Sequence, residues 1–341
     1  MPAPANQPTE VADPRRSRTL LVRILLATWL IGVVAAYLAI NVGMADPASA
    51  DSTFTGLWPL NHPYWFNPLI ALVAIVPALI LGLKVGRAFG LRTRPGSAAA
   101  AFAAGIIAWS IGNLVWFWYN TCTSWGALGC AHTIEAPYPS AADVGFIGLL
   151  PCYAFAMVQL SRMLATTWGD VLRLAWIPVL AFAGTAFLMV PDFTVLGVHV
   201  PAQSLLFDEG YSATQTSFSV LYIVSDAVLL SMAVINLVRA RQAAGGIFFR
   251  AVLLTAVALL LQYFGDLLFD VRVANGSEYA GDIADFIYFW ALFVMVLGIY
   301  VLGRAHERLQ AHVSSMSAAM SLALTADRGE PVAAAAGGDT P

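Results

Sequence analysis

The stretch AGDIADFIYFWALFVMVLGIYVL, residues 280–302, contains no Lys or Arg, and its two carboxylates fall within its first six residues. A bilayer hydrocarbon core about 30 Å thick needs about 20 predominantly apolar residues in one helix. Seven earlier runs have a comparable length, so we expect further helices near residues 19–43, 66–83, 97–119, 141–161, 172–190, 214–237 and 248–269. The sequence therefore predicts an all-α, polytopic integral membrane protein with eight transmembrane helices within residues 19–303.

The overall composition agrees with a membrane location. Of the 341 residues, 59% are hydrophobic and 11% are charged, whereas a soluble domain has about 25% charged residues. The formal net charge is −3, and the basic residues are scattered singly or in small groups. These values exclude a single soluble domain and argue against a nucleic-acid partner.

The basic residues occur in every second connecting segment. They lie before residue 19, at 84–94, at 162–173, at 239–250 and after 303, whereas the segments 45–65, 120–140, 191–213 and 270–279 contain only Arg272. By the positive-inside rule, both termini are expected in the cytoplasm. Sixteen Arg against one Lys, with many Ala, are typical of a GC-rich bacterium. We therefore expect a multi-pass protein of the bacterial inner membrane.

The two terminal regions differ from the apolar part of the chain. Residues 1–18 and 327–341 are rich in Pro, Gly or Ala and are expected to be disordered. Residues 304–326 keep a helical pattern, with Leu309, Val313, Met316 and Met320 spaced by four, three and four. This apolar seam predicts a cytoplasmic helix that either pairs with a second copy as a short coiled coil or covers the cytoplasmic edge of the bundle.

The three cysteines fall into two groups. Cys122 and Cys130 lie eight positions apart in the second outer segment, on the side of the membrane where disulfides persist. We expect them to form a disulfide. Cys152 lies alone inside the fourth apolar run and is expected to be a small packing residue.

Two parts of the chain resemble each other. Units of about 97–163 and 248–303 align Gly112 with Gly265, Asn113 with Asp266, Trp116 with Phe269, Ala142-Asp143 with Ala284-Asp285, and Phe146 with Tyr288. The spacing from the glycine to the final aspartate is longer in the first unit, and the surplus falls where Cys122 and Cys130 lie. Because the units are four helices apart, they predict a parallel four-plus-four repeat.

Three strings carry a resemblance to a known family. Gly112-Asn-Leu-Val-Trp116, Tyr138-Pro-Ser-Ala-Ala-Asp143 and Leu221-Tyr-Ile-Val-Ser-Asp-Ala-Val-Leu-Leu230 resemble the multi-helix membrane region found ahead of GGDEF and EAL domains in bacterial cyclic-di-GMP signalling proteins. The resemblance covers about residues 20–305 and implies a membrane sensor. The residues after 303 contain no GGDEF, EAL or kinase-like sequence, so no catalytic residue is transferred to this chain.

Polar residues inside apolar helices are the best guide to a site, because each costs about 2.5–3.5 kcal/mol at a helix centre on insertion scales. The candidate ligand-binding residues are Asn113, Asp143, Asp226, Gln262, Tyr263, Asp266, Asp282 and Asp285. Most lie in the outer halves of their helices, where they would line a pocket open to the periplasm. Asp143, Asp282 and Asp285 are explained equally well as helix caps or first-turn carboxylates. Asp226 lies in mid-helix, so we expect a neutral side chain that donates a hydrogen bond within the bundle.

Residue availability argues against several chemistries. The single lysine, Lys84, lies at a helix end, which excludes a retinal Schiff base, and no predicted helix carries a histidine for haem. The outer histidines have no close ligand spacing, so neither a metal site nor a cofactor is expected. No catalytic motif was found, and we expect no enzyme activity. The acidic outer loops favour a cationic or neutral ligand over an anion.

The sequence therefore favours a sensory or signalling module without its own catalytic output. Ligand binding from the periplasm would shift the packing of the third, fourth, seventh and eighth helices and move residues 304–326, which would act on a separate cytoplasmic signalling protein. The alternative is a small-solute or ion-coupled transporter, which parallel repeats and intramembrane carboxylates would suit. Against transport, Pro77, Pro151 and Pro178 have no counterparts in the paired helices.

Overall fold

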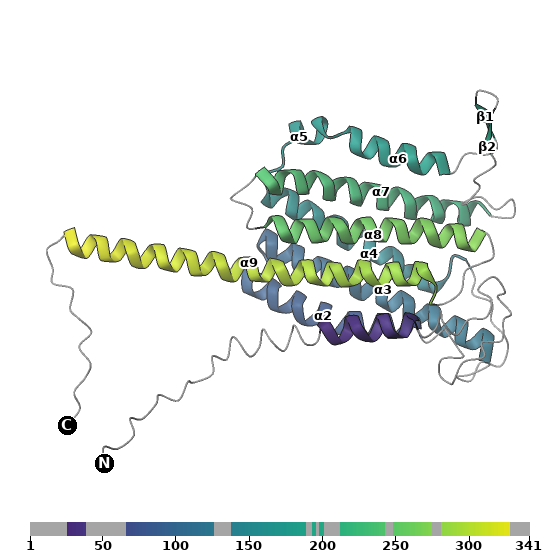
Figure 1. The fold of residues 1–341 in the computed structure, drawn as a ribbon, viewed down its shortest axis with the longest axis horizontal. Coiled ribbons are helices and arrows are strands. Elements are labelled where there is room, and N and C mark those ends of the chain that lie inside the picture. Colours follow the sequence, from purple (N-terminus) through teal and green to yellow (C-terminus); the bar gives the residue numbers. More distant parts are fainter. Residues whose placement is uncertain are drawn as a thin grey trace, which may run out of the picture.

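The computed structural model describes residues 26–38, 66–125, 138–188, 193–195, 198–200, 212–242, 248–274 and 281–327. These form a bundle of roughly parallel and antiparallel helices (Figure 1). The elements in chain order are the helix Leu26–Leu38, α2 (Phe66–Phe89), α3 (Arg94–Trp125), α4 (Ala141–Met163), α5 (Trp168–Arg173), α6 (Trp176–Leu188), β1 (Phe193–Val195), β2 (Val198–Val200), α7 (Ala213–Gln242), α8 (Phe249–Ala274) and α9 (Ile283–Asp327). Strands β1 and β2 pair as a short antiparallel hairpin.

Six of these helices are long and apolar enough to cross a membrane: α2, α3, α4, α7, α8 and α9. The chain is therefore a multi-pass, helical membrane protein. Two further apolar helices, Leu26–Leu38 and α6, are shorter than a span requires within the described residues.

The continuous helix expected over residues 172–190 is wrong, because the structure divides this region. A capping box formed by Thr167 and Asp170 starts α5, which ends at Arg173. Helix α6 begins at Trp176, and Pro178 lies in its first turn. Proline has no backbone N–H to bond the carbonyl four residues earlier, so a helix through residue 174 loses a bond and meets a steric clash there. The helix restarts just before the proline instead.

The six long helices form a closed ring. Each of α2, α3, α4, α7, α8 and α9 contacts the next in this order, and α9 returns to α2. Small residues let the backbones approach, as is usual between membrane helices. A Cβ atom on Gly145 of α4 would lie 2.6 Å from the carbonyl oxygen of Ala108 in α3.

The two short apolar helices lie on the outside of this ring. Helix α6 packs against α7 (Figure 1). Leu26–Leu38 packs against α9 through aromatic rings. Trp29 makes edge contacts with Phe289 and Phe293 at centroid distances of 5.7 and 5.0 Å, and Tyr37 stacks on Phe286 at 4.0 Å.

Helix α9 continues far beyond the ring (Figure 1). Its last residues in contact with α2 lie near His306, whose ring is 4.2 Å from that of Phe89. Residues 307–321 are exposed on every side, including the seam residues Val313, Met316 and Met320. The alternative in which this seam covers the cytoplasmic edge of the bundle is therefore wrong.

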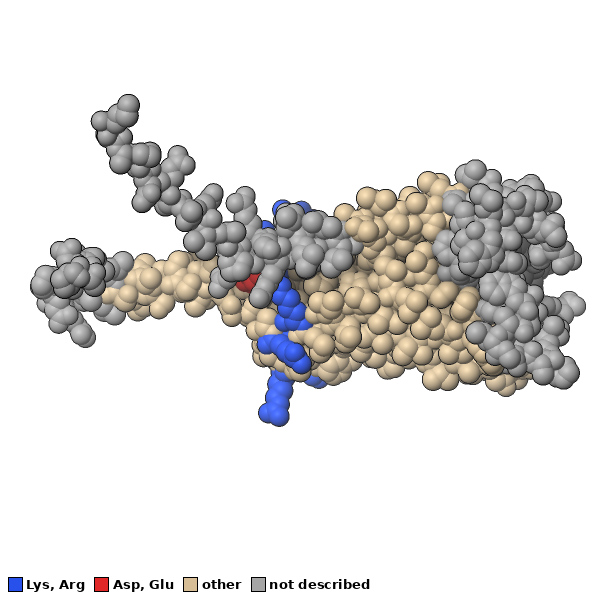
Figure 2. Space-filling view, turned by 90° about the horizontal axis from the view of Figure 1, so that it is seen from below, with Lys and Arg blue, Asp and Glu red and all other residues tan. Residues whose placement is uncertain are grey.

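The described basic residues gather at one end of the ring, which we call the basic end. Eleven of the described Lys and Arg side chains lie there, at Lys84, Arg87, Arg92, Arg94, Arg162, Arg173, Arg239, Arg241, Arg250, Arg304 and Arg308. Figure 2 shows them as a band where the bundle gives way to the free part of α9. Arg272 alone among the described cations lies at the opposite end, where α4 and α9 begin.

Several predictions fall on residues outside the described ranges. They concern the two termini that are expected to be disordered (except Asp327, where α9 ends), most of the outer loops, and Cys130. Cys122 lies near the end of α3, but its side chain is also outside the description. The disulfide between Cys122 and Cys130 stays a prediction.

Candidate functional site

A cavity of about 330 Å³ lies inside the ring at the end opposite the basic end. All six long helices contribute to its wall. The lining residues are Asn67 from α2; Trp109, Asn113 and Trp116 from α3; Tyr138 and, from α4, Asp143, Phe146, Leu149 and Leu150; Gln215, Ser219, Tyr222 and Asp226 from α7; Gln262, Asp266, Phe269 and Asp270 from α8; and Asp285 and Tyr288 from α9. We call this space the polar cavity.

The described lining of the polar cavity contains acidic side chains but no basic ones. Five carboxylates line the polar cavity, at Asp143, Asp226, Asp266, Asp270 and Asp285, and no Lys, Arg or His belongs to the described lining. The antiparallel order of the helices explains why they meet. The late parts of α3 and α8 and the early parts of α4, α7 and α9 all lie at the same end of the bundle.

Asp143 has two structural roles in addition to lining the cavity. It is the third residue of α4, where its Oδ2 accepts hydrogen bonds from the backbone N–H of Ser140 at 2.6 Å and from the Ser140 hydroxyl at 3.1 Å. Its Oδ1 accepts a hydrogen bond from the Tyr222 hydroxyl of α7 at 2.7 Å. Asp143 is therefore both a helix-start carboxylate and a link between α4 and α7.

Asp285 has a similar place at the start of α9. Its Oδ2 accepts a hydrogen bond from the backbone N–H of Gly281 at 2.7 Å, and the side chain borders the polar cavity. Asp143 and Asp285 are therefore each both a carboxylate at the start of a helix and a residue that lines the cavity.

Asp266 is the centre of a second set of contacts. Its Oδ1 accepts a hydrogen bond from the Tyr288 hydroxyl at 2.6 Å, and its Oδ2 accepts one from Nε2 of Gln262 at 3.0 Å. Asp226 of α7, which is 4% exposed, lies close to the same Asp266 carboxyl group.

Two buried oxygen atoms on the cavity wall have no hydrogen-bond donor among the described residues. They are Oδ2 of Asp226 and Oδ1 of Asn67, and each residue is 4% exposed. A buried acceptor left without a donor costs about 1–3 kcal/mol. The polar cavity therefore presents two acceptor atoms that a bound group would satisfy.

Two of the eight predicted residues do not line the polar cavity. Asp282 accepts hydrogen bonds from the backbone N–H groups of Ala284 and Asp285 and pairs with Arg272 at 2.5 Å. Burial raises the pKa of Asp282, and these hydrogen bonds and Arg272 oppose that effect. Tyr263 lies beside Phe264 at a centroid distance of 6.0 Å.

The other six, at Asn113, Asp143, Asp226, Gln262, Asp266 and Asp285, surround one space. Whether they bind a ligand stays a prediction. Sequence reasoning did not select Asp270, Tyr222 or Ser219 as site residues. The spacing of Gln262, Asp266 and Asp270, four and then four residues apart, places all three on one helix face and would have revealed Asp270.

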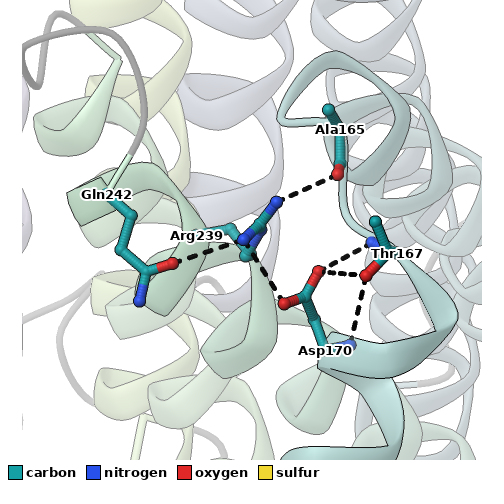
Figure 3. A network of polar contacts seen from close by, with 5 residues as sticks. All are labelled: Ala165, Thr167, Asp170, Arg239 and Gln242. Carbon is teal, nitrogen blue, oxygen red and sulfur yellow. Dashed lines mark hydrogen bonds and ion pairs between the residues drawn. The ribbon is translucent and has the colours of Figure 1, made fainter.

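A separate polar cluster lies at the basic end, between α7 and the α4–α5 connection (Figure 3). Arg239 pairs with Asp170 at 3.3 Å and donates a hydrogen bond to the carbonyl oxygen of Ala165 at 3.1 Å. Hydrogen bonds from the hydroxyl and backbone N–H of Thr167, helped by the Arg239 charge, lower the pKa of Asp170. This cluster, Ala165, Thr167, Asp170 and Arg239, is called the α7 anchor below.

The wall of the polar cavity combines five carboxyl groups with aromatic rings. Within the described part of the chain, no three His, Cys, Asp or Glu side chains are grouped so as to hold a metal ion. Comparison of the chain with protein-family models, with curated proteins and with solved structures found no match.

Proposed function

We propose that the protein is a sensory module of the bacterial inner membrane, without its own catalytic output, that detects a small cationic or neutral ligand from the periplasmic side. The observation that carries this proposal is the polar cavity itself, a space of about 330 Å³ with five carboxylates in its wall. Small-molecule sites are commonly of this size. Ionisable side chains within a membrane are rare and commonly mark ligand or ion pathways, so these carboxyl groups support a functional site.

The output side of the proposal depends on α9. This helix carries Asp285 and Tyr288 on the cavity wall and continues to Asp327 beyond the basic end. A ligand that favours one packing of α3, α4, α8 and α9 over another would therefore also change the position of residues 304–326. A ligand can shift the equilibrium only by its difference in affinity for the two packings.

An eight-span, parallel four-plus-four arrangement fits this proposal. In this repeat the first four helices (Leu26–Leu38, α2, α3 and α4) correspond in order to the last four (α6, α7, α8 and α9). Each contact in one half should then have a counterpart. The α2–α3 contact corresponds to α7–α8, α3–α4 to α8–α9, and α2–α9 to α7–α4, and all of these contacts are present. The aligned glycines support the same pairing: a Cβ atom would lie 2.8 Å from the Phe146 ring at Gly112 and 2.8 Å from the Tyr288 ring at Gly265.

The orientation follows from the positive-inside rule applied to the basic end. With the basic end in the cytoplasm, the polar cavity opens toward the periplasm and both termini are cytoplasmic. Reporter fusions test this directly. Fusions at Gly96 and Gly245 should report the cytoplasm, and fusions at Ala127 and Gly210 the periplasm. A periplasmic C-terminus would refute the eight-span arrangement.

The free part of α9 is proposed to form a parallel dimer with a second copy. Residues 307–321 are exposed, including the apolar seam residues Val313, Met316 and Met320. The spacing of Leu309, Val313, Met316 and Met320 is that of a two-stranded seam. Such a pair of helices would also offer a surface to a separate cytoplasmic signalling protein.

One experiment separates sensing from transport. A spin label at Met316 in the full chain, in nanodiscs, should report a change in interhelical distance when the ligand binds, and a label at Trp168 serves as the control. Proteoliposomes containing the same protein should show no ligand uptake above empty vesicles. Uptake that depends on Asp226, with no change at Met316, would overturn the sensor proposal.

Transport is the second candidate, and a specific observation favours it. Asp143 of α4 and Tyr222 of α7 come from different halves of the proposed repeat, and a hydrogen bond of 2.7 Å joins them at the interface between those halves. Binding at a repeat interface near mid-membrane is characteristic of secondary transporters. The uptake measurement above decides between the two.

A further inference from the structure

The carboxyl groups that line the polar cavity differ in how many of their oxygens accept hydrogen bonds from the protein. Both oxygens of Asp143 and both oxygens of Asp266 accept hydrogen bonds from neighbouring side chains or backbone. Asp226 is different, because its Oδ2 is buried and accepts no hydrogen bond among the described residues. Among the carboxylate oxygens of the described cavity lining, Oδ2 of Asp226 is the one that is both fully buried and without a hydrogen-bond donor.

A second acceptor narrows the kind of group that would fit. Oδ1 of Asn67, on α2, is also buried, also borders the polar cavity and also has no described donor. A primary ammonium group has three N–H donors and one positive charge. It can satisfy more than one acceptor oxygen and can offset carboxylate charge at the same time. A quaternary ammonium has no N–H, and a neutral alcohol has no charge.

The remaining wall of the cavity suits the apolar part of such a molecule. The Trp109 ring lies between those of Phe146 and Tyr288, at centroid distances of 6.0 and 5.7 Å. Aromatic faces attract cations as well as hydrocarbon, and the attraction is stronger where water is excluded. An apolar cavity of about 150 Å³ holds benzene, so about 330 Å³ has room for a ring with a short amino side chain.

We propose that the ligand of the polar cavity is a primary ammonium ion with a compact apolar or aromatic body. The ammonium group is held by Asp226, next to Asp266 and within reach of the Asn67 side chain, and the apolar body lies against Trp109, Phe146 and Tyr288. This inference rests on the proposed function, because it names the class of ligand that the sensor would detect. The binding site itself would serve a transporter equally well.

The test is direct binding to the purified full chain in nanodiscs, measured by calorimetry near neutral pH. The probe is 2-phenylethylamine, which is protonated there because alkyl amines have a pKa of about 10. Two molecules of related shape are compared with it: neutral 2-phenylethanol and the N,N,N-trimethyl derivative. We expect 2-phenylethylamine to bind at least about tenfold more tightly than either, as the loss of a charged hydrogen bond implies. This ligand series needs no variant.

Variants then locate the site. Asp226→Asn keeps the shape of the side chain but removes the carboxyl group that would pair with the ammonium ion, and it should weaken binding of 2-phenylethylamine by at least about tenfold. Glu307→Gln removes a carboxylate from the exposed part of α9 and should leave binding unchanged. Thermal unfolding without ligand establishes that Asp226→Asn is folded.

Three results would overturn the proposal. They are no detectable binding of 2-phenylethylamine, equal or tighter binding of the neutral or trimethyl molecule, or unchanged binding by folded Asp226→Asn. The Met316 label distinguishes this failure from failure of the sensor proposal. Tight binding of the amine with no change at Met316 would support the ligand class and reject the sensor proposal. A change at Met316 caused by another ligand, with no binding of the amine, would support the sensor proposal and reject the ligand class.

Discussion

Replacing Gly265 by alanine tests the packing that holds the cavity wall together. A Cβ atom at this position would lie 2.8 Å from Cε1 and 2.9 Å from Cδ1 of Tyr288. Carbon atoms pack at about 3.5–4.0 Å, so the ring would have to move by roughly 0.7 Å. Tyr288 is buried, and its hydroxyl is 2.6 Å from Asp266. The new methyl group therefore disturbs both a packed ring and a hydrogen bond to a carboxylate.

The expected magnitude combines three effects. Overpacking costs about 1–3 kcal/mol, and a weakened hydrogen bond to a charged group costs up to about 1.5–3 kcal/mol. Alanine in place of glycine inside a helix returns about 1 kcal/mol. We therefore expect Gly265→Ala to lower the free energy of unfolding by about 2 kcal/mol. The measurement is reversible unfolding in mixed micelles, followed by circular dichroism.

The chain offers a matched control in Gly184 of α6, where a Cβ atom would meet no heavy atom within 4 Å. Gly184→Ala should be neutral or stabilising by up to about 1 kcal/mol. In the background of Tyr288→Leu the cost of Gly265→Ala should largely disappear, because contacting residues are not additive. Equal stability of Gly265→Ala and Gly184→Ala would refute the close contact.

Other predictions concern the basic end and the outer loop. Ala165 has φ 52°, a conformation that favours glycine, so Ala165→Gly should raise the free energy of unfolding by up to about 1 kcal/mol. As a control, Ala154→Gly inside α4 should lower the free energy of unfolding. Unfolding in the same mixed micelles measures both variants. Because its pKa is lowered, Asp170 contributes stability above its ordinary pKa of about 3.9, and this contribution is lost as the pH falls through the lowered value. Melting temperatures between about pH 3 and 6 should therefore fall more in the parent than in Asp170→Asn, and parallel curves would contradict this. Peptide mapping of unreduced protein should find Cys122 linked to Cys130, and alkylation of both thiols in freshly isolated membranes would argue against the link.

The long helices could be predicted from the sequence because a bilayer demands runs of a fixed apolar length. The faces of those helices could not, because a membrane helix is apolar on nearly all sides. Gln262 and Tyr263 illustrate this difference. They are adjacent, so they point about 100° apart, and only Gln262 shares the cavity face with Asp266. The helix expected over residues 248–269 ends one residue before Asp270, whereas α8 continues to Ala274.

The two polar clusters of the molecule are connected by helices that differ in how their far ends are held. On α7, Asp226 lies about 20 Å along the helix from Arg239 at 1.5 Å per residue, and Arg239 is fixed by the α7 anchor. On α9, Tyr288 lies about 48 Å from Met320, and residues 307–321 of this helix are exposed. A change in packing around the polar cavity therefore moves α9 more than α7, since α7 is restrained at both ends. A rotation of α9 by even a few degrees is carried to its seam, which is why the readout of ligand binding is expected at Met316 and Met320 and not at Arg239.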